Sequence, residues 1–218
     1  MFDFLAPLAG VVYPLLSLFL ILGVLAAVGL EGLWSATLML VNIIVAGLIA
    51  LGFYEPLAAF AQDYFYGGAF FWDWFFLGSL FAISVYVLRA VTDFMSPRKV
   101  RFPEMADTIG GPVMGAVCGY ALLCFLSVGM QVVPLEPKPM GGSYVPGQGS
   151  LVGLDPGSQF LGFTYYQASG ALAPLLFETD LSTLNNFQQT YTRRRELYAT
   201  PKSNEAGPSG VWNTPAGS

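Results

Sequence analysis

The residues whose spacing carries the most chemical information are one carboxylate and three glycines in an apolar segment. Asp107, Gly111, Gly115 and Gly119 follow one another at intervals of four residues. On a helix, residues four apart lie on nearly the same face, so the glycines predict a smooth groove. Helices in lipid associate by close packing over small residues. We therefore predict a helix-packing face at the three glycines, within the chain or between copies, with a substrate or ion path as the alternative.

Asp107 itself has two interpretations. A carboxylate at the head of a helix is favoured by the helix dipole and by free backbone N–H groups, so Asp107 is predicted to cap its helix at a membrane surface. A functional carboxylate in an ion path would need a partner inside the membrane, and no other charge lies deep in a predicted span. Asn42 and Gln131 are predicted to form hydrogen bonds between helices.

The chain has few of the side chains on which catalytic and metal sites depend. It contains no histidine, which excludes Ser-His, Cys-His and His-ligated metal sites. Cys118 and Cys124 lie in an apolar run and are predicted to be small packing residues. The carboxylates are scattered, and the glycine-rich segments lack the context of a phosphate-binding loop. We therefore expect no enzymatic activity, no cofactor and no metal ion.

The composition points to a membrane protein. Hydrophobic residues make up 55% of the 218 residues and charged residues only 11%, whereas an ordinary soluble domain has roughly a quarter charged. So few charges cannot cover a soluble surface. The formal net charge is −5 and no Lys or Arg precedes Arg89, which argues against nucleic acid as a partner. The expected partner is the lipid bilayer.

Uncharged stretches predict an all-α polytopic protein, because a helix needs about 20 apolar residues to cross the hydrocarbon. The third stretch is the shortest, and aromatic residues typical of a membrane surface crowd its start. Pro134 is predicted to end the fourth helix. The turn between the first two spans is short enough to predict a tight antiparallel hairpin. The four predicted spans are residues 4–30, 33–54, 74–88 and 109–133.

Basic residues near the membrane predict its orientation, because short loops rich in Lys and Arg stay in the cytoplasm. The connection between spans three and four holds four of them: Arg89, Arg98, Lys99 and Arg101. That connection and the turn between the first two spans are therefore predicted to be cytoplasmic. The N-terminus, the acidic 54–72 connection and the C-terminus are predicted to be extracytoplasmic.

After the last span the composition changes to Gly and Pro and then regains aromatic residues. A short helix is predicted from about Thr179 to Leu197. This extension could lie against the membrane surface, pack on the 54–72 connection or order only with a partner. The predicted regions are a transmembrane domain (1–135), a linker (136–157), a small partly ordered extension (158–200) and a disordered tail (201–218).

The order of these elements resembles the colicin V production protein family of bacterial inner-membrane proteins. The similarity covers roughly residues 10–135: a first span, the turn GLEGLW, a second span ending in YEPLA, a third span followed by a basic stretch, and the Asp-xxx-Gly-xxx-Gly-xxx-Gly series that starts at Asp107. The family typically carries Arg or Lys beside the glycine of this turn, whereas this chain has Glu31.

The resemblance implies a bacterial inner-membrane protein with an accessory or scaffold role in toxin production or secretion and in the envelope. A homo-oligomer or other envelope membrane proteins are the implied partners. The alternative is a small channel or transporter subunit formed by oligomerisation, in which the glycine face lines or gates a path. Because an ion path normally shows polar groups embedded in the membrane and this chain shows almost none, we favour the scaffold.

Overall fold

The computed structural model describes residues 10–64, 69–96, 103–133, 143–145, 153–170 and 186–193. The helical elements are α2 (Val12–Val28), the short 3-10 helix η2 (Gly29–Glu31), α3 (Leu33–Tyr64), α4 (Ala69–Met95), α5 (Glu104–Val132) and α6 (Pro156–Ala168), and residues 186–193 are also helical. Four of the helices, with η2 continuing α2, are long and apolar enough to cross a membrane. The prediction of an all-α chain with four helices apolar and long enough to span a membrane is confirmed for the described residues.

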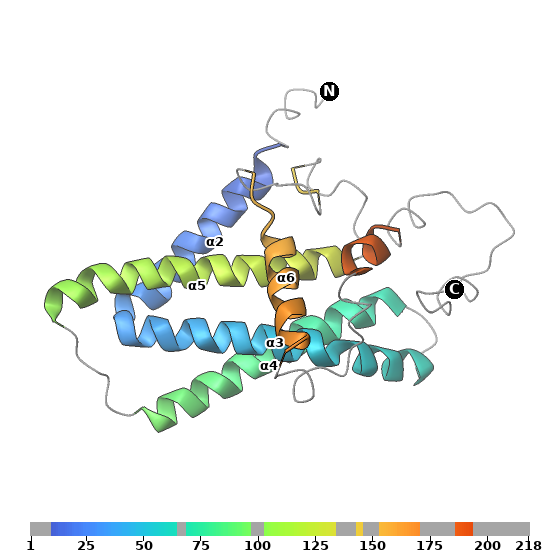
Figure 1. Ribbon diagram of the computed structural model, residues 1–218, viewed down its shortest axis with the longest axis horizontal. Helices are drawn as coiled ribbons and strands as arrows, with labels where there is room; N and C mark the ends of the chain where they lie inside the picture. Colours follow the sequence, from blue (N-terminus) through green and yellow to red (C-terminus); the bar gives the residue numbers. More distant parts are fainter. Residues whose placement is uncertain are drawn as a thin grey trace, which may run out of the picture.

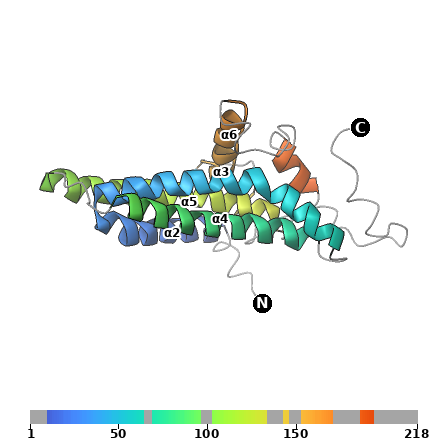
Figure 2. The ribbon, with the colours of Figure 1, turned by 90° about the horizontal axis from the view of Figure 1, so that it is seen from below.

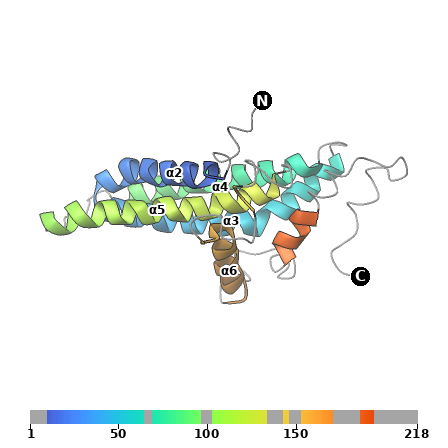
Figure 3. The ribbon, with the colours of Figure 1, turned by 90° about the horizontal axis from the view of Figure 1, so that it is seen from above.

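The four long helices form an elongated bundle in which α3 and α5 are central (Figure 1). α4 packs on α3, and α2 packs on α5 (Figures 2 and 3). α2 and α3 are joined by the tight turn at η2, but they touch each other little, because α5 lies against both. The prediction of a hairpin is therefore right for the short connection between α2 and α3, but these two helices pack mainly on α5 and little on each other.

α3 and α4 are longer than the charge spacing predicts. α3 continues past Glu55 and Pro56 to Tyr64, so the predicted acidic 54–72 connection is largely helical. Alanine favours helix here, and Ala58 and Ala61 are buried at helical spacing. Pro56 removes one backbone hydrogen bond, a loss that helices in membrane proteins tolerate when they are packed on neighbours.

α5 begins earlier than predicted and ends where predicted. Its first residue is Glu104, so Asp107 lies within the first turn and not at the start of the helix. Its last residue is Val132, and Val133 has an extended backbone. A residue before proline avoids the helical conformation, so Pro134 accounts for this end.

α6 runs across the bundle, roughly perpendicular to the long helices (Figures 1 to 3). Its Asp155 cap accepts a hydrogen bond from the Ser158 backbone N–H at 3.3 Å, and Pro156 is the first helical residue. These are strong helix-start signals, but they fall at the boundary between the predicted linker (136–157) and the predicted partly ordered extension (158–200), for which the sequence predicts no helix here. α6 inserts Phe160 at Gly47 of α3, where a Cβ would lie 2.5 Å from the ring.

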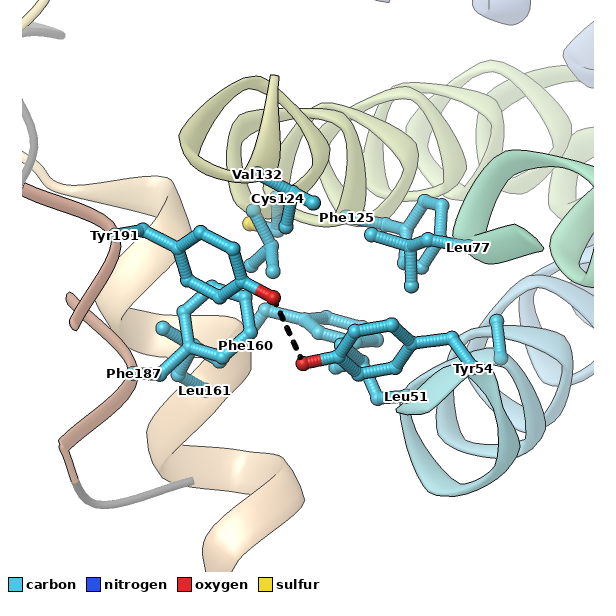
Figure 4. Close-up of a cluster of buried hydrophobic side chains, with 12 residues drawn as sticks. Leu51, Tyr54, Leu77, Cys124, Phe125, Val132, Phe160, Leu161, Phe187 and Tyr191 are labelled. Carbon is cyan, nitrogen blue, oxygen red and sulfur yellow. Dashed lines mark hydrogen bonds between the residues drawn. The ribbon is translucent and has the colours of Figure 1, made fainter. Parts of the chain in front are cut away.

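The helical residues 186–193 also fold back onto the bundle. Phe187 and Tyr191 are buried in the largest apolar cluster, beside side chains of α3, α4, α5 and α6 (Figure 4). The Tyr191 hydroxyl lies 3.3 Å from that of Tyr54 and donates to Asp73 at 3.4 Å. Residues 186–193 thus contact the bundle at Tyr54 and Asp73, at the two limits of the predicted 54–72 connection.

Candidate functional site

The glycine face of α5 contacts the backbone of α2 and η2. A Cβ built at Gly115 would lie 2.8 Å from Gly29 Cα, and one at Gly119 would lie 2.8 Å from Ile21 Cα. A Cβ at Gly111 would lie 2.5 Å from the Gly29 carbonyl oxygen. Real Cβ atoms do not approach other atoms so closely, so only glycine permits this packing. The three glycines are therefore used within the chain.

Both sides of this close contact carry a glycine, because Gly29 directly follows α2. A Cβ at Gly29 would lie 3.0 Å from the Gly111 carbonyl oxygen and 3.0 Å from Pro112 Cα. Gly29, Gly111, Gly115 and Cys118 are all buried. Two smooth backbones in direct contact gain van der Waals packing, which is the main source of helix association in lipid. The contact leaves no space at this face for another helix or for a ligand.

Asp107 bonds to α3 instead of capping its own helix. Its Oδ1 accepts a hydrogen bond of 2.7 Å from the backbone N–H of Leu33, the first residue of α3. A helix N-terminus has free N–H groups and partial positive charge, so a carboxylate there stabilises it. The Asp107 carboxylate of α5 thus caps the N-terminus of α3, a role that usually belongs to the residue just before the helix.

Gly32 is required at this junction for two reasons. Its φ is +103°, a conformation that residues with a side chain rarely adopt. In addition, a Cβ at Gly32 would lie 2.9 Å from Oδ1 of Asp107, so a side chain would displace the carboxylate. The turn after η2 is therefore shaped to receive Asp107.

Replacing Asp107 with alanine is expected to lower the free energy of unfolding by about 1–2 kcal/mol, the cost of losing a helix cap. Asp107→Asn keeps an acceptor oxygen and should lose less than half of that. Stability in mild detergent, followed by thermal or denaturant unfolding, measures the change.

Asp93→Ala is the matched control for Asp107→Ala. The Asp93 side chain is 70% exposed and pairs with Arg89 only at 3.8 Å, so its loss should change stability by less than about 0.5 kcal/mol. An Asp107→Ala protein as stable as the Asp93→Ala protein would contradict the capping role.

One of the residues that predict orientation, Arg89, lies at the η2 end of the bundle. Arg89 of α4 forms an ion pair of 3.1 Å with Glu31. Glu31, which departs from the basic residue expected at this turn, is thus the partner of an arginine on a neighbouring helix. The remaining members of the set lie outside the described residues: Arg98, Lys99 and Arg101.

Polar side chains inside the bundle pair with one another. Asn42 of α3 donates to the Thr92 hydroxyl of α4 at 3.1 Å, which confirms the predicted bond between helices. Gln131 is fully buried, and its amide donates to the Tyr144 hydroxyl at 3.3 Å, in the segment after α5 and not in another long helix. Cys118 donates to the Ala36 carbonyl at 3.2 Å and is a packing residue between α5 and α3.

A buried hydroxyl cluster at the opposite end of α2 was not predicted. The Tyr13 and Ser127 hydroxyls lie 2.8 Å apart, and the Tyr13 and Tyr144 rings lie 4.8 Å apart. Ser143 accepts from the Tyr13 backbone N–H at 3.3 Å. Because these residues come from three distant segments, no spacing in the sequence could have grouped them.

The described residues show close helix packing and several polar side chains bonded to one another. Among them, no three His, Cys, Asp or Glu side chains lie together in a way that could hold a metal ion. Cys118 and Cys124 are both free and buried. Comparisons with protein-family models, with curated proteins and with solved structures found no match.

Proposed function

We propose that this chain is a non-enzymatic scaffold or accessory protein of the bacterial inner membrane, with the η2 end of the bundle and Arg89 in the cytoplasm. Its role would lie in envelope assemblies, including those that produce or secrete peptide toxins, as the resemblance to the colicin V production family implies. The termini would then lie on the extracytoplasmic side. Its partners would be further copies of the chain or other membrane proteins.

One observation carries the choice of a scaffold over a channel. A channel built on the glycine face would need Gly111, Gly115 and Gly119 to border an open path, and all three contact the α2 and η2 backbone. The buried Asn42 donates to the half-buried Thr92. Among the described spans, α4 has the smallest buried share, 6%, so its surface is the one most available to partners.

The scaffold proposal predicts that the purified protein carries no ions or small solutes. Full-length protein reconstituted in liposomes should show the same flux as liposomes without protein, because the bundle is closed along α5. Flux is measured with a proton-sensitive dye and with a potassium-sensitive dye, at a range of protein-to-lipid ratios.

Flux above that of empty liposomes, rising with protein content, would overturn the scaffold proposal in favour of the channel. A second experiment looks for the partners of the scaffold. The protein is tagged at its C-terminus and co-purified with its partners from native membranes. A scaffold should retain the same membrane partners through repeated purification. A variant with charge on the outer surface of α4, such as Val87→Asp, should lose them.

A further inference from the structure

An apolar groove of about 430 Å³ lies between α2 and α5, outside the glycine contact. It is lined mainly by apolar residues, which include Leu16, Leu20 and Gly23 of α2 and Leu123, Leu126 and Met130 of α5. Both walls belong to helices that are apolar enough to cross a membrane. The groove therefore opens toward the hydrocarbon of the bilayer.

The groove begins where the glycine series ends. Gly119 is the last glycine that contacts α2, and the next residue at the same spacing is Leu123. A leucine side chain holds two helices apart where a glycine lets them touch. Gly23 has no atom within 4 Å of a built Cβ, so the groove is open beside it. The groove is thus a consequence of the length of the glycine series.

Three buried residues with hydroxyl groups line one end of the groove. The hydroxyls of Tyr13 and Ser127 lie there, 2.8 Å apart, and Ser17 donates to the Tyr13 carbonyl at 2.8 Å. This end coincides with the start of α2, and Tyr13 contacts Ser143 beyond the end of α5. Gln131, one turn past Ser127, is fully buried, and its Oε1 has no hydrogen-bond donor among the described residues.

The length of the groove matches one leaflet of a bilayer. From Tyr13 to Val24 the lining of α2 extends about 16 Å, at about 1.5 Å per residue. Half of a hydrocarbon core of about 30 Å is about 15 Å. Water is a poor occupant, because the apolar part of the lining offers it too few hydrogen-bond partners.

We propose that this groove binds one acyl chain of a phospholipid from the leaflet at the Tyr13 end. The ester region of that lipid lies near the hydroxyls of Tyr13, Ser17 and Ser127. The acyl chain fills the space between α2 and α5 that the described residues leave open. A bound lipid would hold the two helices in register beyond the glycine contact.

The test uses the full chain in vesicles of phosphatidylethanolamine and phosphatidylglycerol. A fraction of the phosphatidylethanolamine carries a photoreactive diazirine at the middle of one acyl chain, and labelled residues are identified by mass spectrometry. Labelling at Leu16, Leu20 and Leu123 should exceed by several-fold that at Ile83 and Val87, which are exposed on α4. Equal labelling at the two sets would overturn the proposal, since it would show only the ordinary lipid surroundings of a membrane helix.

Gly23→Phe fills the groove without touching the backbone and should lower the groove labelling to the level seen on α4. Gly78→Phe is the matched control, because Gly78 also has no atom within 4 Å of a built Cβ and lies on α4, outside the groove. It should leave groove labelling unchanged. Leu16→Trp is a second filling variant, in case the first lowers stability.

Two further outcomes would overturn the proposal. One is groove labelling that persists unchanged in both folded filling variants. The other is disulfide cross-linking between two copies through a cysteine placed at Leu20, which would identify a second copy of the chain as the occupant. Lipid binding predicts no such cross-link above that of a cysteine placed at Val113, which is exposed on α5 outside the groove.

Discussion

Replacing Gly115 with leucine is expected to break the packing of α2 on α5 and to unfold much of the protein in detergent. A Cβ at this position would lie 2.8 Å and 2.9 Å from Gly29 backbone atoms and 3.1 Å from Leu25 Cα. Backbone atoms cannot rotate out of the way as a side chain can, so the helices would have to separate. We expect a loss of at least about 3 kcal/mol, the upper end of the cost of overpacking. Size-exclusion chromatography and thermal unfolding measure it.

Gly129→Leu provides the matched control. Gly129 lies on the same helix, but no atom comes within 4 Å of a Cβ built there. The substitution should therefore change the unfolding temperature by no more than a surface substitution does. Equal stability of the Gly115→Leu and Gly129→Leu proteins would show that α2 and α5 do not pack as described. The same result would remove the main argument against the channel alternative, in which ions or solutes pass along the glycine face.

Replacing Phe187 with alanine is expected to release residues 186–193 from the bundle. Phe187 is fully buried in the apolar cluster, with its ring 4.6 Å from that of Tyr191 (Figure 4). Removing a buried phenylalanine side chain costs about 3–5 kcal/mol. A helix of this length is not stable alone, so its order depends on these contacts. A loss of about 3 kcal/mol raises the equilibrium constant for release of residues 186–193 by about 100-fold.

Limited trypsin digestion measures this release, because Arg193 lies at the end of the described helical segment and is exposed. Cleavage there should accelerate strongly in the Phe187→Ala protein while the four long helices stay intact. Tyr166→Ala, on α6, is the control, since that side chain is 74% exposed. Unchanged cleavage at Arg193 after Phe187→Ala would contradict the docking of the extension.

These expected results concern two different parts of the molecule. The Gly115 contact holds the membrane-spanning helices together, and the Phe187 contact attaches the C-terminal extension to them. Tyr191 adds hydroxyl contacts to Tyr54 and Asp73, so the extension contacts both α3 and α4. The extension is the part of the chain that the resemblance does not cover.

Several features of the fold could be predicted because their cause is local. Charged side chains are excluded from hydrocarbon, so the spacing of charges determined the number of spans. The glycines at positions 111, 115 and 119 share a helix face whatever the rest of the chain does. Pro134 ends α5 through its effect on the residue just before it. None of these depends on a distant contact.

The partners of these features could not be predicted, because they depend on contacts between distant residues. Asp107 was expected at the head of its own helix, and it bonds to Leu33, 74 residues away. α3 and α4 extend past the charges that seemed to end them, because they pack on each other beyond that point.

By itself, then, the sequence determined that this is a protein of four apolar helices with one smooth glycine face. Those properties follow from the preference of apolar side chains for hydrocarbon and from the period of the α-helix. Both can be read within a single segment of the chain. Only the tertiary structure decided that α2 covers the glycine face, that Asp107 caps α3 and that the C-terminal extension returns to the bundle. The physical reason is that packing and hydrogen bonding join groups by their positions in space, which chain spacing does not encode.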